Sequence, residues 1–438
     1  MFGLLGEHAR YVLAMPQADA FKRVLGLPQV TMSGIAVIIG AGIFVLLGPA
    51  AREARGAVWL SFVIAGLLSA LTAFSYMELA SMFPRAGSEH EFASQVFPRW
   101  VAVVVGWAMT AALVVAAATV SLGFGRYVNE FVNVDERFAA AMLLVVMSVV
   151  SYLGMERAAW LVIGMALVEV GSLVVVMVIG VPSIGNHDLT SGTVGGVLGA
   201  AGLVFFAFIG FDEVITLSEE TRNPSRNIPR ALLIALGIST LLYVGVAVSA
   251  VSVLGADGLA AAQRPLAEVG EQVLGSWAGS ALSVAAMVST GTTVLLVLTA
   301  ASRMFYGMAD AGDLPKFLAE IRFQRVPMNA LIVALIAALG LLMLGDLRTL
   351  ASATDALIYL TFLVVNAAVV ALRRTMPDRE RPFRIRGAIG WVPVLPISAF
   401  VVVLVVAREL DTASFWMAGV IVALGVGVYA VQRLVGDA

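Results

Sequence analysis

Long apolar runs follow one another along almost the entire chain. Each is long enough to cross a bilayer as a helix, which takes about 17–25 residues, and the runs are continuous rather than alternating, which disfavours a transmembrane barrel. Hydrophobic residues make up 60% of the 438 positions and charged residues 13%, whereas a soluble domain is about half apolar and a quarter charged. A soluble helical protein with one very large core is therefore a weak alternative. We predict an all-α polytopic membrane protein with twelve transmembrane helices, at 29–51, 57–82, 98–125, 138–155, 158–181, 194–218, 229–254, 277–308, 327–345, 350–372, 391–407 and 413–434.

The distribution of lysine and arginine predicts how these helices are oriented. Cytoplasmic loops are enriched in both residues, and with a cytoplasmic N-terminus, twenty of the 27 basic residues fall on the cytoplasmic side. An even number of helices places the C-terminus on that side too. Residues 1–28 lack the apolar core of a removable signal peptide, so we expect them to form a cytoplasmic N-terminal segment. The expected location is a bacterial-type inner (cytoplasmic) membrane.

Composition also disfavours several function classes. The chain has no cysteine, which excludes thiol catalysis and cysteine metal sites. Its histidines, His8, His90 and His187, are too scattered to predict a metal cluster. No nucleophile–base pair or phosphate-binding loop indicates an enzyme, and the net charge of −2 does not indicate nucleic acid. We therefore expect a protein that is not an enzyme and has no metal and no cofactor.

Two of the apolar runs contain glycine at membrane depth. The run at 29–51 includes "SGIAVIIGAGIFVLLGPA", with Gly40 and Gly42, and the run at 194–218 includes "GLVFFAFIGFDEVITLSEE", with Gly210. Such glycines often form a close-packing seam between helices. A matched pair in corresponding positions of two repeats instead indicates broken helices at a transporter's midplane site. A break offers free N–H groups at a positive helix end and free C=O groups at a negative one, which suits a zwitterion.

Three stretches resemble a known family. "IIGAGIF" in the first run, "PRAGSEHEF" after the second and "FFAFIGFDEVITLSEETRNPSRNIPRAL" through the sixth are similar to the amino acid–polyamine–organocation (APC) superfamily. The branch that they resemble is that of the bacterial and cationic amino acid transporters. The resemblance implies a LeuT-like inverted repeat of five helices plus five, with helices 1 and 6 broken. The first repeat would span 29–181, the second 194–372, and 391–434 would hold transmembrane helices 11 and 12.

The resemblance also implies where a substrate binds. The substrate carboxylate would be held by backbone N–H groups at Gly40, Ala41 and Gly42, and its amine by carbonyls near Ile38, Phe206, Ala207 and Ile209. Phe206 would cap the pocket beside Gly210. Asp212 would start the second half of the broken helix by capping it, or would contact a cationic substrate group. These assignments rest mostly on backbone, so they predict an amino acid without predicting which one.

The sequence departs from the family pattern in two places. Relatives often have Gly-Gly-x-Tyr-x-Tyr after the second helix, where this chain has "GSEHEF" at 87–92. We expect His90 to be a loop residue at the cytoplasmic surface, with a role in pH sensing as the alternative. In the third run, Gly106 and Trp107 lead to Ala111 and Ala112, where many relatives place a glutamate.

Glu169 is the one ionisable side chain between Arg157 and His187. A charge at the bilayer centre costs about 2.5–3.5 kcal/mol on insertion scales, so this acid needs an explanation. Proton-coupled relatives place a lysine at about this position. Our hypothesis is that Glu169 carries the coupled proton. The alternatives are that it binds sodium with Thr292 and Thr293, or that it stays protonated in a bond between helices.

The remaining charged residues receive structural interpretations. Glu219 and Glu220 would pair with Arg222, and Asp310 and Asp313 would be ordinary interfacial residues. The basic run at 373–390 would determine topology or contact anionic lipid.

Taken together, these features predict a secondary active transporter of amino acids that works by alternating access and is driven by a proton gradient. A sodium-coupled or exchange-type transporter of amino acids or polyamines is the first alternative. A transporter-like amino acid sensor is the second, although sensors of this fold usually add a long soluble tail. The expected partners are a small amino acid and the lipid bilayer, and the sequence predicts no oligomeric state.

Overall fold

The computed structural model describes residues 25–83, 89–153, 159–217, 221–321 and 327–436. The first elements are α2 (Leu27–Ile38), α3 (Gly42–Ala54), the 3₁₀-helix η1 (Arg55–Ala57), α4 (Val58–Met82), α5 (Glu89–Ser94), α6 (Arg99–Val128), α7 (Glu136–Leu153), α8 (Ala159–Gly180) and η3 (Val181–Ser183). They are followed by α9 (Val194–Val204), η4 (Phe205–Phe208), α10 (Glu213–Thr216), α11 (Pro224–Ala261), α12 (Pro265–Leu274), α13 (Ser276–Asp310), η6 (Lys316–Ala319), α14 (Met328–Leu344), α15 (Leu347–Thr375), α16 (Val394–Ala407) and α17 (Thr412–Gly436). A small antiparallel hairpin, β1 (Ala388–Ile389) with β2 (Val392–Pro393), precedes α16.

The described helices have the length and composition of membrane spans. Nine segments in the described ranges are helical and apolar over at least 18 residues, and three shorter apolar helices, α2, α14 and α16, accompany them. Large apolar side chains also lie exposed on the outer helices, among them Leu167 (63%), Leu241 (71%) and Trp416 (72%). Exposing such an apolar surface to water would be unfavourable, whereas contact with lipid is not. The prediction of a polytopic helical membrane protein is confirmed.

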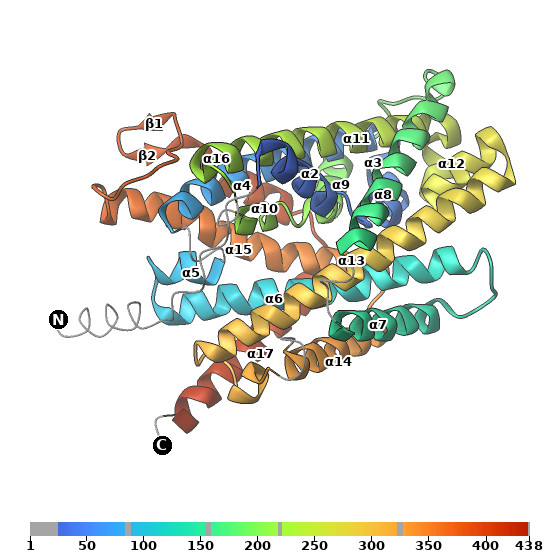
Figure 1. The fold of residues 1–438 in the computed structure, drawn as a ribbon. Coiled ribbons are helices and arrows are strands. Elements are labelled where there is room, and N and C mark those ends of the chain that lie inside the picture. The colour runs from blue at the N-terminus through green and yellow to red at the C-terminus, as the bar shows by residue number, and fades with distance from the viewer. Residues whose placement is uncertain (1–24, 84–88, 154–158, 218–220, 322–326, 437–438) are drawn as a thin grey trace.

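Helix α6 forms the centre of the bundle. In its most apolar part, 78% of the residues are buried, against 17% in α17 at the periphery. Figure 1 shows α6 lying along α15 and crossed by α13, and both of these helices contact it. The buried residues Ala116, Ala117 and Ala118 lie in the middle of α6. Small side chains let membrane helices approach closely, which explains how several helices can surround this one.

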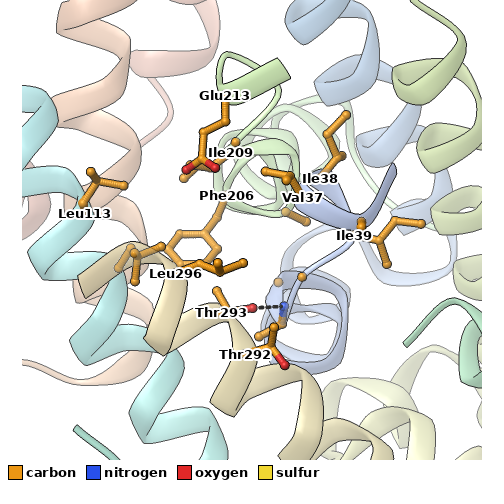
Figure 2. Close-up of a pocket in the computed structure, with 18 of the residues that line it drawn as sticks. Val37, Ile38, Ile39, Leu113, Phe206, Ile209, Glu213, Thr292, Thr293 and Leu296 are labelled. Carbon is orange, nitrogen blue, oxygen red and sulfur yellow. Dashed lines mark hydrogen bonds between the residues drawn. The ribbon is translucent and has the colours of Figure 1, made fainter. Parts of the chain in front are cut away.

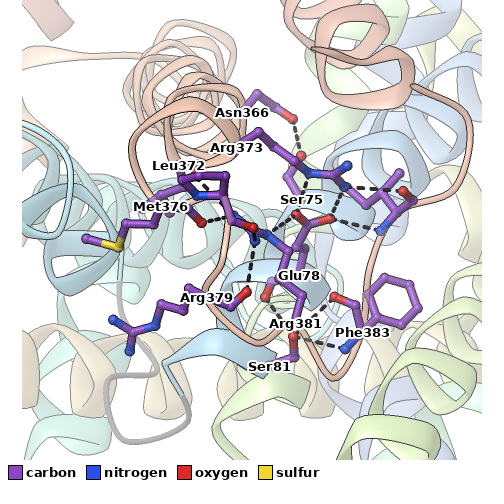
Figure 3. Close-up of polar contacts among 12 residues, drawn as sticks. Ser75, Glu78, Ser81, Asn366, Leu372, Arg373, Met376, Arg379, Arg381 and Phe383 are labelled. Atoms are coloured by element: carbon purple, nitrogen blue, oxygen red, sulfur yellow. Dashed lines mark hydrogen bonds and ion pairs between the residues drawn. The ribbon is translucent and has the colours of Figure 1, made fainter. Parts of the chain in front are cut away.

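The buried carboxylate of Glu78, on α4, binds the end of α15 and the segment that follows it (Figure 3). Glu78 on α4 is 1% exposed. It accepts hydrogen bonds from Nε and Nη2 of Arg373, at 2.8 and 2.5 Å, and from the backbone N–H of Ile385, at 2.8 Å. Nε of Arg381 lies 3.3 Å from the same carboxylate. Two arginines of the basic run at 373–390 are thus committed to an ion pair inside the protein, a role that the sequence did not indicate.

The variant Glu78→Gln tests this cluster. It should lower the stability of the protein in detergent by about 3–5 kcal/mol, because it leaves two buried guanidinium groups without a counter-charge. The measurement is the thermal unfolding transition. The matched control is Asp257→Asn, which removes an exposed pair in which Arg55 and Asp257 lie 2.8 Å apart and should change stability by less than about 1 kcal/mol. Equal effects of the two variants would contradict the role given to Glu78.

Candidate functional site

The first apolar run is broken where its glycines predict a break. Helix α2 ends at Ile38, the next residue leaves the helix with φ −80° and ψ 89°, and α3 begins at Gly42. A Cβ placed on Gly42 would lie 2.6 Å from the Cα of Ala207, in the second broken segment. Only glycine therefore lets the two breaks come into direct contact.

The second break lies in the stretch "FFAFIGFDEV". Helix α9 passes into the 3₁₀-turn η4, and Gly210 then adopts φ +102°, which favours glycine, before α10 begins at Glu213. A Cβ on Gly210 would lie 2.9 Å from Cγ1 of Val37, on the first broken segment. Each break thus packs against the other through a glycine.

A cavity of about 60 Å³ lies between the two breaks and the helices α6, α8 and α13. It is smaller than typical small-molecule sites, which measure about 300–1,000 Å³, so the cavity has little free space in this conformation. All of the residues that the sequence predicts for substrate and ion binding line it, namely Ile38, Gly40, Ala41, Gly42, Phe206, Ala207, Ile209, Gly210, Asp212, Glu169, Thr292 and Thr293. The structure brings these residues together from four separate parts of the chain, and what they bind stays a prediction.

Two of the three predicted carboxylate-binding amides already have protein partners. The N–H of Gly40 donates to the carbonyl of Ile38 at 3.0 Å, and the N–H of Ala41 donates to the hydroxyl of Thr293 at 3.1 Å (Figure 2). Gly42 is the first residue of α3, and the first N–H groups of a helix have no intrahelical acceptor. The positive end of α3 is therefore directed at the cavity through Gly42.

The carbonyl groups of both breaks meet at one side chain that sequence reasoning missed. The hydroxyl of Tyr243, on α11, lies 2.8 Å from the carbonyl oxygen of Ile38 and 2.9 Å from that of Ala207. A hydroxyl has one hydrogen to donate, so Tyr243 shares it between these two carbonyls, and Ile38 also accepts from the N–H of Gly40. A substrate amine that approached Ile38 would compete with both donors. Tyr243 is fully buried. It is the one tyrosine in the run at 229–254, and that isolated polar group is the sequence feature that could have indicated its role.

The wall of the cavity is mostly apolar. Figure 2 shows the ring of Phe206 between Leu113 and Leu296, with the carboxyl group of Glu213 directed toward the same space. Phe206 is 6% exposed and lines the cavity, and its role as a cap over a bound substrate stays a prediction. Glu213 was not predicted to line the site, because its position beside Asp212 gives no information on which of the two acids faces inward.

Glu169 is buried at another wall, 2% exposed. Its polar neighbour is Ser289, and its Oε1 atom has no hydrogen-bond partner among the described residues. The two threonines that could share a cation with it have other contacts. The hydroxyl oxygen of Thr292 lies 2.9 Å from the carbonyl oxygen of Val288. The hydroxyl of Thr293 accepts a hydrogen bond from the N–H of Ala41, in the first break.

Asp212 is placed as expected but does not cap. It directly precedes α10, and its side chain makes no capping hydrogen bond to that helix. The expectation that Asp212 caps the second half-helix through its side chain is therefore wrong.

Two other expectations also change. His90 lies on the short helix α5 rather than in a loop, and its Nε2 is 3.0 Å from Asp313. Asp313, expected to be an ordinary interfacial residue, is 1% exposed and also binds Arg99 at 2.8 Å. Of the expected pairs at 219–222, residues 219 and 220 lie outside the described part of the chain.

The sequence model of the family described as "Amino acid permease" matches residues 25–426. The chain belongs to this family. It is 28% identical over 421 residues to the branched-chain amino acid permease BcaP of Bacillus subtilis, covering 88% of this chain and 87% of the relative. It is also 28% identical to the methylthioribose transporter of the same organism, over 95% and 94% of the two chains. A vacuolar cationic amino acid transporter of Arabidopsis thaliana is 29% identical over 79% of this chain and 62% of its own length. The resemblance to the APC superfamily is thereby confirmed, and the permease is a transporter rather than an enzyme.

The contact between the two breaks can be tested with Gly42→Ala. The added methyl group would collide with Ala207, so we expect a loss of about 1–3 kcal/mol in stability and weaker substrate binding. Thermal unfolding and a ligand-induced shift of its midpoint measure the two effects. The control is Gly340→Ala in α14, where a Cβ meets nothing within 4 Å and the substitution should be neutral or stabilising. Tolerance of Ala at position 42 would refute the close approach.

Tyr243→Phe tests how the breaks are held. The variant keeps the ring but removes the hydroxyl, which should cost about 1–3 kcal/mol because buried carbonyl groups lose their donor. Tyr429→Phe, on the peripheral helix α17, serves as the control and should leave the unfolding midpoint unchanged. If both variants melted like the wild type, the hydroxyl of Tyr243 would not be holding the breaks together.

Proposed function

We propose that this permease is a secondary active transporter that moves an amino acid across a bacterial inner membrane by alternating access, coupled to protons through Glu169. The observation that carries the proposal is the cavity between two contacting helix breaks, with a buried acid in its wall. We further infer twelve transmembrane helices with both termini in the cytoplasm. Residues 29–181 and 194–372 would form the inverted repeats, and each would contribute one break.

A zwitterion suits the electrostatics of the two breaks. The carboxylate would sit at the N-terminal end of α3, at Gly42, where the helix dipole is positive. The ammonium group would lie toward the carbonyl groups of the broken segments. Ala207 is a candidate acceptor, because it shares the one hydroxyl hydrogen of Tyr243 with Ile38, while Ile38 also accepts from the N–H of Gly40. Phe206 would close over the bound molecule. Relatives named for branched-chain and cationic amino acids support this class of substrate.

Glu169 suits proton transfer for two reasons. It is buried in the cavity wall, so a charge on it is costly and a proton that neutralises it is strongly favoured. It also has no basic partner in its described surroundings, so no fixed cation competes with that proton. Sodium coupling is the second candidate, because Thr292 and Thr293 line the same cavity and hydroxyl oxygens are suitable ligands for a hard cation.

Transport in proteoliposomes separates these alternatives. With an imposed proton gradient, wild-type permease should concentrate substrate, and Glu169→Gln should lose concentrative uptake while it keeps exchange of labelled for unlabelled substrate. The amide has nearly the same shape but cannot carry a proton. Uptake driven by a sodium gradient alone would favour the second candidate.

The control for this experiment is Glu380→Gln, which changes an exposed glutamate after α15 and should transport like the wild type. Concentrative uptake by Glu169→Gln would show that the coupled proton binds elsewhere. Substrate binding without any exchange, in the wild type, would instead favour a sensor.

A further inference from the structure

A groove on the surface of the bundle lies apart from the cavity between the helix breaks. It has a volume of about 480 Å³ and is bounded by α15, α16 and the segment between α5 and α6. On α15, Asn366, Val370 and Arg374 line it at intervals of four residues, which places them in one row along the helix. From α16, Ile397 and Phe400 line it, and Ile397 is 41% exposed. The groove therefore opens between two neighbouring helices on a side of the bundle that would face lipid.

The groove is about as deep as one leaflet of a bilayer. A rise of about 1.5 Å per residue places Asn366 about 12 Å from Arg374 along the helix, and half of a bilayer's hydrocarbon core is about 15 Å thick. At the deep end, Asn366 is fully buried. Its side chain accepts a hydrogen bond from Ser75 at 2.6 Å and donates one to the carbonyl of Phe362 at 2.8 Å. This end therefore requires no polar ligand, and an apolar chain suits it.

The mouth of the groove has the side chains of a membrane–water interface. Figure 1 shows the hairpin of β1 and β2 at one end of the bundle. Trp391, in the turn of this hairpin, lines the groove and is 49% exposed, and tryptophan is enriched at membrane interfaces. Arg374 lines the groove at the end of α15 and is exposed, and an arginine at the end of a membrane helix extends its charge toward the headgroups. The mouth is thus expected at the level of the lipid headgroups.

The arginines of the basic run fall into two groups. Figure 3 shows Arg373 and Arg381 directed at Glu78. Arg379 lies over the ring of Phe83, 4.3 Å from its centre. The other three arginines are exposed and have no hydrogen bond or ion pair within the part of the chain that the structure describes, namely Arg374, Arg384 and Arg386. One of these unpaired cations therefore stands at the groove.

The surroundings of the mouth are strongly positive. The run at 373–390 contains six arginines and only two acids. Arg386 lies close to the wall formed by α16, because the carbonyl of the next residue, Gly387, accepts a hydrogen bond from the N–H of Val394 at 3.0 Å, at the start of that helix. A negatively charged headgroup at the mouth would gain an attraction that a zwitterionic headgroup would not.

We propose that this groove binds one anionic phospholipid, with an acyl chain between α15 and α16 and the phosphate at Arg374. The depth of the groove, its apolar walls and the unpaired cation at its mouth carry the proposal. The bound lipid would hold α16 against α15. Its assignment to the inner leaflet rests on the orientation inferred under the proposed function, whereas the groove and its charge do not depend on transport.

Native mass spectrometry of the purified protein tests the site. The protein, in detergent, is mixed with phosphatidylglycerol or with phosphatidylcholine of identical acyl chains, and the affinity of the first bound lipid is compared. We expect phosphatidylglycerol to bind about five-fold more tightly, because a basic residue near an anionic lipid surface contributes about 1 kcal/mol and a tenfold change in Kd is about 1.4 kcal/mol. The preference should decrease as the salt concentration rises, since salt screens exposed charges.

Variants of the groove separate its charge from its shape. Arg374→Gln changes an exposed residue and should remove most of the preference for phosphatidylglycerol, whereas Arg374→Lys should keep it. Ala371→Trp, which places a bulky ring in the groove, should weaken the binding of both lipids. The matched control is Arg433→Gln, which changes an exposed arginine in the last turn of α17 and should bind lipid like the wild type.

Fluorescence in proteoliposomes provides a second readout in a bilayer. The signal of Trp391 is obtained as the difference between the wild type and Trp391→Phe. Phosphatidylglycerol brominated on its acyl chain should quench this signal more strongly than brominated phosphatidylcholine does. Arg374→Gln should make the two lipids quench it equally.

Four results would overturn the proposal. The first two are equal binding of the two lipids by the wild type and an unchanged preference in Arg374→Gln. The third is an equal loss of preference in Arg433→Gln, which would indicate a diffuse attraction to the basic surface. The fourth is a dimer without bound lipid that Ala371→Trp dissociates, which would assign the groove to a second copy of the chain. None of these measurements requires transport, so a protein that keeps its lipid preference but does not concentrate substrate would refute only the transport proposal.

Discussion

Backbone that leaves the helix inside a bilayer must find hydrogen-bond partners within the protein, because lipid offers none. Two side chains from distant helices meet this requirement here. The hydroxyl of Thr293 accepts from the N–H of Ala41, and the hydroxyl of Tyr243 lies within hydrogen-bond distance of the carbonyl oxygens of Ile38 and Ala207. The first break is thereby held in place by α13 and α11, and the second by α11. The shape of the cavity depends on these few bonds.

This arrangement links the small cavity to the possibility of movement. The hydrogen bonds that hold the breaks are made by single hydroxyl groups, which can be exchanged for a polar ligand at little net cost, since one hydrogen bond replaces another. An amino acid that supplied an ammonium group for the Ala207 carbonyl would compete with Tyr243. An incoming substrate would then loosen the bond that joins the two breaks while it fills the space between them. Substrate binding and rearrangement of the broken helices would thus be the same event.

The sequence predicted the features that depend on local pattern. Hydropathy predicted a bundle of apolar, membrane-spanning helices, although the number twelve stays a prediction. Glycines at 42 and 210 indicated both breaks, because glycine permits the close approach at Ala207 and the positive φ at 210. It did not predict Tyr243 or the burial of Asp313. Their roles come from contacts with residues far away in the chain, such as Ile38 for Tyr243, and a pattern of neighbours carries no information on these. The capping role expected for Asp212 failed for the same reason.

The cost of burying a carboxyl group is met in different ways within this protein. Glu78 is neutralised by arginines, and its role is structural. Glu130, at the end of α6, is partly buried, yet hydrogen bonds from Ser283 and Ser280 and the charge of Arg264 outweigh that burial and lower its pKa. Asp355, in α15, is fully buried and neither of its carboxyl oxygens has a partner among the described residues. An acid that stays paired with a cation keeps its negative charge, so it does not take up or release a proton. Acids that lack such a cation can gain or lose a proton as their surroundings change. Under the proposed coupling, Glu169, which lines the cavity and has no basic partner in its described surroundings, would be the acid whose charge the transport cycle uses.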